Sequence, residues 1–272
     1  MELSTKKYKK GLSKRESFLI SFLAREDKTV FTIEDAKKIF KENVKKIMHS
    51  LIQKKWVLPL KRGLYVIVPL DVGIKGADSF ILHNFVIASF LVKPYYIGFW
   101  SALNYYGFSE QVPRTTFIAT SIATKSLNIL NSEYYFVKLV RRKFFGIKKI
   151  EIDGRKVNIS DPDKTLVDCL DHPQHCGGID ELARAIYFSH QELDFKKIKK
   201  YTIKMGNLTI LKRLGYILDK TNLLESYQDI FRDFIPSKGY SSLDPLSPKK
   251  GKYDVKWNLL VNCKISTEGW MY

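Results

Sequence analysis

Side chains suited to contacting nucleic acid recur at helical spacing near residue 50. The spacing is i, i+3, i+4 and i+7, which places the set on one face of a helix: Lys46, His49, Ser50 and Gln53. Each can donate a hydrogen bond to a base edge or a phosphate, and none is acidic. We expect these four to read base edges. Neighbouring cations are expected to neutralise phosphates: Lys45, Lys54, Lys61 and Arg62.

The helix that would position this face runs from about Val44 to Gln53. Its opposite side carries apolar residues at i, i+3, i+4, i+7 and i+8, which is the pattern of an amphipathic helix: Val44, Ile47, Met48, Leu51 and Ile52. Asn43 stands where a side chain could cap the first free amides. The sequence therefore predicts a helix with one buried side and one basic side.

Two helices and a hairpin are predicted around it. Ser13–Arg25 has an apolar stripe at Phe18, Leu19, Phe22 and Leu23. A second helix is expected at Ile33–Phe40, where Thr32 can cap the first amides and Asp35, three residues on, fits a capping-box variant. Two β-rich runs, 56–60 and 64–69, flank a turn at Lys61, Arg62 and Gly63. This order is typical of a winged helix-turn-helix, in which the third helix enters the major groove and the hairpin tip lies against the backbone or minor groove.

The distribution of charge favours the same interpretation. The chain has 46 Lys plus Arg against 28 Asp plus Glu, a net charge of +18. Residues 1–69 alone hold 17 against 7, a net of +10. Such a charge attracts polyanions, nucleic acid first and anionic membrane second. A basic helix is often only a solvated face, but the neighbouring elements and the basic hairpin favour DNA. A membrane-surface protein would favour a long amphipathic helix with aromatic anchors, so we rank it last.

A second, larger domain is predicted from residue 78 to 272, after a winged helix-turn-helix domain at 1–70 and a linker at 70–77. Asp78–Val92 and Tyr95–Tyr106 suggest apolar helices that end at Pro94 and Gly107. Short β-rich runs follow, with a hairpin turn at Asp153 and Gly154: 115–120, 134–140, 148–152 and 157–160. Further helices are expected at 160–170, 179–188, 195–205, 208–218 and 223–234, before a tail that is mostly loop with a strand-like run at 257–261. The expected fold class is α+β, with a small antiparallel sheet and several helices.

Acidic residues around the short strands raise an enzymatic alternative. A metal-dependent nuclease needs carboxylates that converge on Mg²⁺ beside a lysine, and the candidates are Glu151, Asp153, Asp161, Asp163 and Lys164. However, Asp153 precedes a glycine in a turn, and Asp161 precedes a proline at a helix start. These structural roles account for the acids, so a nuclease, or another nucleic-acid-processing enzyme with a winged helix, remains the alternative hypothesis.

Other signatures of catalysis and metal binding are missing from the sequence. His172, His175 and Cys176 are too close together to present three ligands from one rigid element. No phosphate-binding loop, His-Glu-x-x-His or Gly-x-Ser-x-Gly occurs. We therefore expect that the protein is not an enzyme and has no catalytic residues, no metal and no cofactor.

The remaining sequence features concern the compartment. The three cysteines are odd in number and have no Cys-x-x-Cys spacing, which favours reduced thiols. No apolar run approaches the roughly 20 residues of a membrane span, and the lysine-rich start lacks a signal peptide. We expect a cytoplasmic protein.

Two segments of the second domain resemble one known family. Residues 98–112 read GFWSALNYYGFSEQV and precede Pro113 and a predicted strand, and residues 160–186 read SDPDKTLVDCLDHPQHCGGIDELARAI. The second segment has a Ser/Asp-Pro start, a Thr-Leu-Val-Asp helix, a proline break and a Gly-Gly helix start. With the winged helix and Lys256, Trp257 and Asn258, the chain resembles the AbiEi-type antitoxins of abortive-infection (type IV) toxin–antitoxin systems over nearly its whole length.

This resemblance implies an autoregulating antitoxin. The winged helix would repress its own operon by binding operator repeats in double-stranded DNA, and the second domain would counteract a nucleotidyltransferase toxin without forming a stable complex with it. Because one helix-turn-helix reads a single short half-site, we expect binding as a pair on repeated sites.

Overall fold

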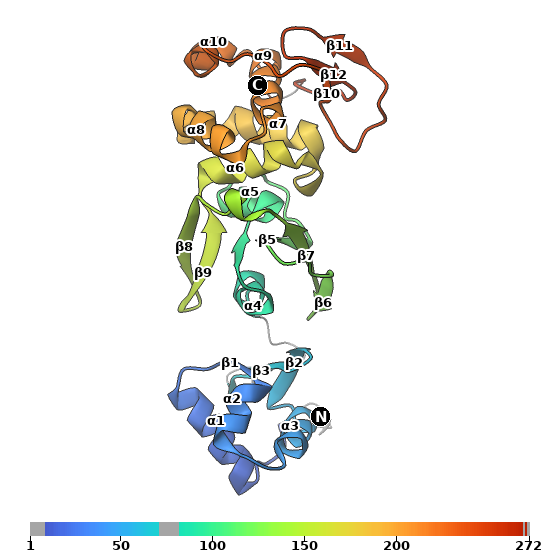
Figure 1. Cartoon of the computed structure of the whole chain (residues 1–272). Coiled ribbons are helices and arrows are strands. Elements are labelled where there is room, and N and C mark those ends of the chain that lie inside the picture. Colours follow the sequence, from blue (N-terminus) through green and yellow to red (C-terminus); the bar gives the residue numbers. More distant parts are fainter. Residues whose placement is uncertain (1–8, 71–81, 269, 271–272) are drawn as a thin grey trace. The chain divides into compact units, whose positions relative to one another are not determined.

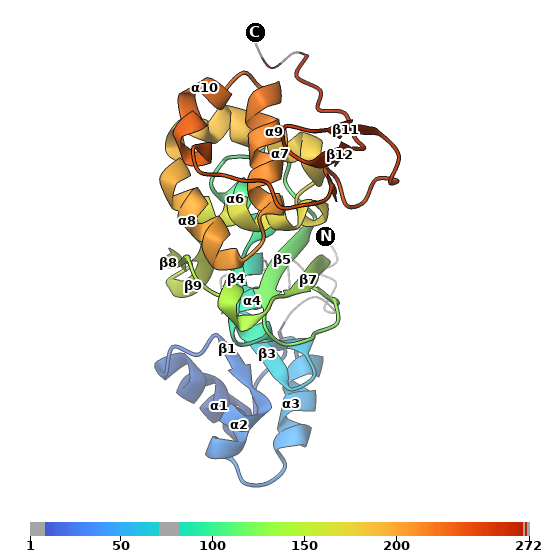
Figure 2. The same cartoon turned by 45° about the horizontal axis from the view of Figure 1, so that its top comes forward.

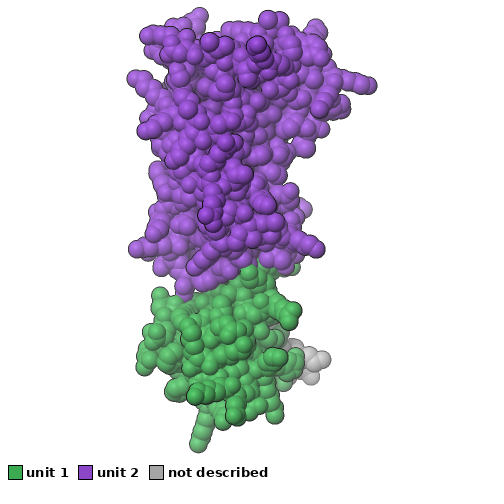
Figure 3. All heavy atoms as spheres, in the orientation of Figure 1, with its two compact units in different colours: residues 1–83, 129–131 green, residues 84–128, 132–272 purple. Residues whose placement is uncertain are grey.

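The computed structural model describes residues 9–70, 82–268 and 270. The chain divides into two compact units, which Figure 3 colours separately: residues 1–83 with 129–131, and residues 84–128 with 132–272. Each unit combines helices with strands, so the α+β class expected from the sequence is confirmed. The predicted linker lies outside the described residues except for Leu70, which is exposed.

The described part of the first unit contains three helices and a three-stranded antiparallel sheet (Figure 1). Its elements are α1 (Lys14–Arg25), β1 (Val30–Thr32), α2 (Ile33–Ile39), α3 (Val44–Gln53), β2 (Val57–Lys61) and β3 (Leu64–Ile67). Strand β3 lies between β1 and β2, with Val66 opposite both Val30 and Leu58. The three helices and the hairpin were predicted. Strand β1 was not, because three residues are too few to show a period of two.

Local capping explains where the first two helices begin. Ser13 accepts a hydrogen bond from the Glu16 amide while the Glu16 carboxylate accepts one from the Ser13 amide, and Thr32 and Asp35 form the same reciprocal pair before α2. The expected cap of α3 was wrong. Asn43 has a φ of 60° and its side chain makes no capping hydrogen bond. Its left-handed backbone, which asparagine tolerates better than most residues, ends the turn between α2 and α3.

The apolar stripes of the helices meet in one core. Its buried members come from all three helices and from the sheet: Leu19, Leu23, Phe31, Ala36, Val44, Ile47, Met48, Leu51 and Val57. Phe18, which was expected in the stripe of α1, is 57% exposed. Its ring lies at the rim, 6.0 Å from that of Phe40. The side of α3 opposite the basic residues is therefore fixed by packing.

The second unit is built on a six-stranded sheet in the order β6-β7-β5-β4-β9-β8. The strands are β4 (Tyr95–Ile97), β5 (Thr115–Thr120), β6 (Leu127–Ile129), β7 (Ser132–Lys138), β8 (Ile147–Ile152) and β9 (Arg155–Ser160). The prediction of a small antiparallel sheet was wrong. The sheet is mixed, because β4 pairs in parallel with β9 and β5 pairs in parallel with β7. Only the β8–β9 hairpin was marked by a local turn signal, and its residues Asp153 and Gly154 both have positive φ.

Two apolar helices predicted before the sheet differ in the structure. Helix α4 covers only Asn84–Leu91, and residues 78–81 of the expected helix lie outside the described residues. The expected helix 95–106 is the central strand β4 followed by α5 (Phe99–Tyr105). Its aromatic start and the interruption at Gly98 favour a strand. All three residues of β4 are buried, which explains the continuous apolar run.

The helices after the sheet agree with the predicted pattern until the last one. They are α6 (Pro162–Asp171), α7 (Gly178–Ser189), α8 (Phe195–Met205), α9 (Thr209–Lys220) and the short α10 (Leu224–Tyr227), with 3₁₀ turns η4 (Arg141–Lys143), η5 (Pro173–His175), η6 (His190–Glu192) and η7 (Gln228–Phe231). The predicted helix 223–234 is only α10 and η7. The tail adds a small sheet, β10 (Ser241–Ser242), β11 (Lys252–Asp254) and β12 (Leu259–Val261), where a loop was mainly expected.

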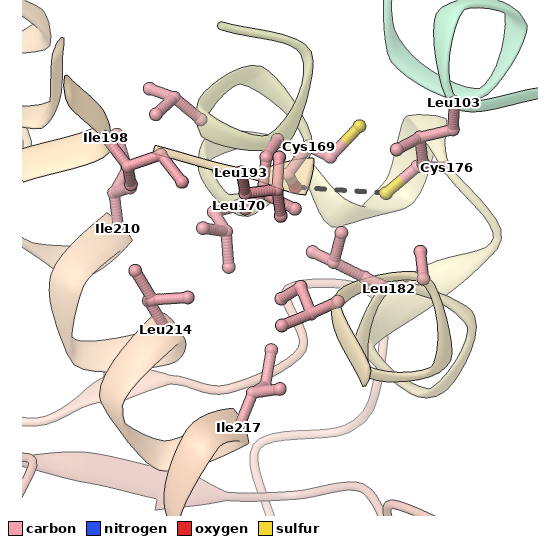
Figure 4. Close-up of a cluster of buried hydrophobic side chains, with 14 of the residues drawn as sticks. Leu103, Cys169, Leu170, Cys176, Leu182, Leu193, Ile198, Ile210, Leu214 and Ile217 are labelled. Atoms are coloured by element: carbon pink, nitrogen blue, oxygen red, sulfur yellow. Dashed lines mark hydrogen bonds between the residues drawn. The ribbon is translucent and has the colours of Figure 1, made fainter. Parts of the chain in front are cut away.

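Helix α6 is the centre of the helical layer of this unit. It packs against α5, α8 and α9, and Figure 2 shows α6 to α9 gathered at one side of the six-stranded sheet. Figure 4 shows the apolar core between these helices, where Leu170, Leu182 and Leu214 converge. The Cys176 thiol there donates to the carbonyl of Cys169 at 3.9 Å. None of the helices in the described ranges has the length and apolarity needed to cross a bilayer.

Candidate nucleic-acid interface

The outer side of α3 divides into two rows of side chains. Lys45, His49 and Gln53 follow one another at intervals of four residues, and all three are exposed. The apolar side of the helix, with Ile47 and Leu51, is buried in the core. Three hydrogen-bonding side chains therefore project from a helix that the core holds in place.

The second row lines a groove beside the first turn of α1. Lys46 and Ser50 come from α3 and Lys54 directly follows it, while residues 13–16 line the groove from α1 and its N-cap. Lys14 and Arg15 are both exposed there, so they add two cations close to Lys46. Neither of these two residues was among the predicted contacts. The Ser13 cap, which puts them in the first helical turn, was the available signal.

A buried carboxylate occupies the floor of this groove. Glu16 is 3% exposed, and its Oε2 lies 2.6 Å from the Nζ of Lys54. Burial alone would raise the pKa of Glu16, but hydrogen bonds from Lys54, Ser50 and Ser13 outweigh it and lower the pKa to about 2. Two of the predicted DNA-contacting residues, Ser50 and Lys54, thus bind a carboxylate of their own chain.

The hairpin that follows α3 is short, and its turn is hydrogen-bonded to the start of α2. Strands β2 and β3 are joined at Arg62 and Gly63, and the Gly63 carbonyl accepts a hydrogen bond from the amide of Ile33 at 2.8 Å. The bond holds the turn against the first residue of α2. Arg62 is exposed, whereas Lys61 is half-buried and burial lowers its pKa. Arg62 is therefore the more accessible of the two predicted cations.

The acids of the nuclease alternative hold α6 in place. Asp161 accepts the Lys164 amide as the N-cap of α6 and also accepts the Tyr201 hydroxyl at 2.8 Å. Asp163 accepts the Asp194 amide and pairs with Lys197 at 2.8 Å. Each carboxylate thus has protein donors that join α6 to α8.

The lysine of that alternative is fully buried. Lys164 and Asp168 are both 0% exposed and form an ion pair one helical turn apart, and the Tyr96 hydroxyl donates to Asp168 at 2.8 Å. Burial raises the pKa of Asp168 despite its partner Lys164. Asp153 lies in the exposed β8–β9 turn with Glu151 beside it. The acids and lysine therefore divide between a buried network and an exposed hairpin.

The histidine and cysteine cluster lies among aromatic rings. His175 lies against the rings of Phe99, Phe117 and Tyr135, and burial, with a smaller contribution from His172, lowers its pKa to about 4. Within residues 9–70, 82–268 and 270, no group of three or more His, Cys, Asp or Glu side chains is arranged to hold a metal ion.

The fold of this chain is similar to that of a solved structure. No family model and no curated protein matches the chain. The crystal structure of the RV2827C protein from Mycobacterium tuberculosis is similar, with a TM-score of 0.69 and 14% sequence identity over 94% of each chain. At this identity the likeness concerns the fold alone.

Proposed function

We propose that this chain is a sequence-specific DNA-binding transcription regulator in which residues 9–70 act as a winged helix-turn-helix. The observation that carries the proposal is the exposed row on α3, formed by Lys45, His49 and Gln53. An α-helix of about 10–12 Å diameter fits the major groove of B-DNA, which is about 12 Å wide. The row offers an ammonium, an imidazole and a carboxamide to base edges, with no carboxylate among them.

The base-reading role belongs mainly to this row. The amide of Gln53 can both donate to and accept from an adenine edge, a bidentate pairing worth about 1–3 kcal/mol of discrimination. His49 and Lys45 can donate to guanine. This assignment moves Lys45 from the phosphate contacts to the base contacts, because it lies in line with His49 and Gln53 and not over the groove.

Phosphate binding falls to the cations beside the row. Lys46, Lys14 and Arg15 surround one groove, and Arg62 projects from the hairpin turn. A DNA strand passing along α3 would place its phosphates against these positive groups. Contacts to phosphates carry no sequence information, but they fix the register of the protein on DNA. Ser50 and Lys54 instead stabilise the unit through Glu16.

We further propose an AbiEi-type antitoxin role, in which the chain represses its own operon and counteracts a nucleotidyltransferase toxin through the second unit. The support is the segment 160–186 that carries the resemblance. Three polar residues of this segment make contacts at α6: Asp161 caps the helix, and Lys164 pairs with Asp168 within it.

Titration of the full chain against its own upstream DNA tests the regulator. Tight binding to that DNA, weak binding to a scrambled duplex of equal length and a steep fall with salt are expected. Equal affinity for both duplexes would contradict the proposal. Two half-sites are expected in the DNA that the protein binds, spaced by about one helical turn of DNA or a multiple of it.

The antitoxin role needs a separate experiment. Co-expression with a neighbouring nucleotidyltransferase gene, where one adjoins, should restore growth that the nucleotidyltransferase alone arrests. A variant lacking the exposed α3 row should still restore growth, because the neutralising activity is assigned to the second unit. Continued arrest with the wild-type chain would contradict the antitoxin role while leaving the regulator intact.

A further inference from the structure

We propose that the second unit binds single-stranded nucleic acid in a basic groove between the β8–β9 hairpin and the end of α4. The end of α4 and the residues after it line one part of the groove: Ser89, Phe90, Lys93 and Tyr95. The hairpin lines the other part: Lys149, Gly154, Arg155, Lys156 and Asn158. This activity is distinct from operator binding by the first unit and does not depend on it.

Positive charge from separate segments converges on this groove. Lys93 follows α4, Lys149 belongs to β8 and Lys156 to β9, and all three are exposed. Arg155 adds a fourth cation. The described residues that line the groove include no carboxylate. Four cations without a lining acid favour a ligand that carries several negative charges.

The pairing of β8 with β9 sets the spacing of two of these lysines. Lys149 lies opposite Asn158 and Glu151 lies opposite Lys156, so the two lysines are diagonal neighbours on one face of the hairpin. Diagonal neighbours are roughly 7–8 Å apart, which is comparable with the distance between successive phosphates of one strand. Glu151 shares the face but is not among the residues that line the groove.

The remaining groups in the groove suit a strand whose bases are unstacked. The ring of Phe90 is half-buried, with the Arg155 guanidinium 5.8 Å from its centroid. Aromatic and guanidinium faces bind unpaired bases by stacking, which a duplex cannot offer. The Asn158 amide and Ser89 hydroxyl add polar groups at the groove wall. We therefore assign the groove to a single strand and not to a duplex.

Fluorescence anisotropy with a labelled oligouridylate of about 12 nucleotides tests the groove in the full chain. The background carries Lys45→Ala, Lys46→Ala and Gln53→Ala, which weakens binding by α3. Adding Lys149→Ala with Lys156→Ala should weaken binding about tenfold or more. The logarithmic salt dependence should become shallower by about 1.4, because two phosphate-binding lysines are removed. Glu151→Gln should strengthen binding.

The matched control is Lys249→Ala with Lys250→Ala, two exposed lysines of the same unit outside the groove. It changes the net charge equally and should alter affinity by no more than about twofold. Circular dichroism would establish that both double variants are folded. Equal losses in the two double variants would overturn the proposal, because only total charge would then matter. Tighter binding of a duplex of the same length would overturn the assignment to a single strand.

Discussion

The Nζ of Lys54 lies 2.6 Å from the Oε2 of Glu16, and this ion pair joins the end of α3 to the start of α1. The carboxylate also accepts the amide of Ser13, so one buried group both caps α1 and holds α3. The orientation of the exposed row on α3 therefore depends on a buried residue outside that row.

Replacing Lys54 should affect stability more than DNA binding. Lys54→Ala leaves the Glu16 carboxylate buried without its cation, at an expected cost of about 1–3 kcal/mol in the opening free energy of α3. Hydrogen exchange of α3 amides measures this. Lys45→Ala, an exposed control on the same helix, should change stability by no more than about 0.5 kcal/mol. An undisturbed α3 together with a shallower salt dependence of operator binding would instead make Lys54 a phosphate contact.

Acid should weaken the same junction. The pKa of Glu16 falls from an ordinary 4.5 to about 2 in the folded chain, because hydrogen bonds to its charged form outweigh burial. Its stabilisation is thus complete above about pH 4.5 and is lost as pH falls towards 2. Hydrogen exchange of α1 in wild type and Glu16→Gln, compared at each pH, should show a difference at neutral pH that shrinks in acid. A difference independent of pH would contradict the assignment.

These two residues also show what the sequence could reveal. The helix at Ser13–Arg25 was predicted from its apolar stripe, whereas the Ser13 and Glu16 capping box, which lies within four residues, was a local signal that went unused. The ion pair of Glu16 with Lys54 spans 38 residues and arises only when α1 and α3 pack together. Lys54 accordingly appeared to be one more basic residue, while Lys14 and Arg15 were overlooked.

Parallel strand pairing escaped prediction for the same reason. The β8–β9 hairpin was recognised from Asp153 and Gly154, which favour positive φ at adjacent positions. The pairing of Ile97 with Ile159 joins strands 62 residues apart and has no turn to mark it. Because β4 is buried throughout, its apolar run matched a core helix as well as a strand.

The close approach of the Trp257 ring to α9 in the second unit predicts that position 215 requires glycine. A Cβ on Gly215 of α9 would lie 2.1 Å from the Trp257 ring, so alanine must displace that ring from the cluster around it. Gly215→Ala should destabilise the unit by about 1–3 kcal/mol, although alanine is the better helix former. Thermal unfolding should show a lower Tm. Gly11→Ala, where nothing lies within 4 Å, is the control, and an unchanged Tm in both would contradict the contact.

The groove beside α1 predicts a purely electrostatic contribution from Lys46. Lys46→Ala should weaken binding to operator and scrambled DNA by similar factors, because phosphates are the same in every sequence. The slope of log K against log salt should become shallower by about 1. Arg15→Ala should behave alike, and Lys249→Ala should not. Selective loss on the operator alone would instead place Lys46 among the base contacts.

Base reading by α3 is tested most directly by the ratio of operator to scrambled-DNA affinity in wild type and Gln53→Ala, measured at one salt concentration. Gln53 is exposed and projects from a helix whose other side is buried. The variant should lose about 1–3 kcal/mol on the operator and little on scrambled DNA, so that the ratio falls about 5- to 150-fold. An unchanged ratio would contradict base reading by Gln53 and with it the proposed role of the α3 row.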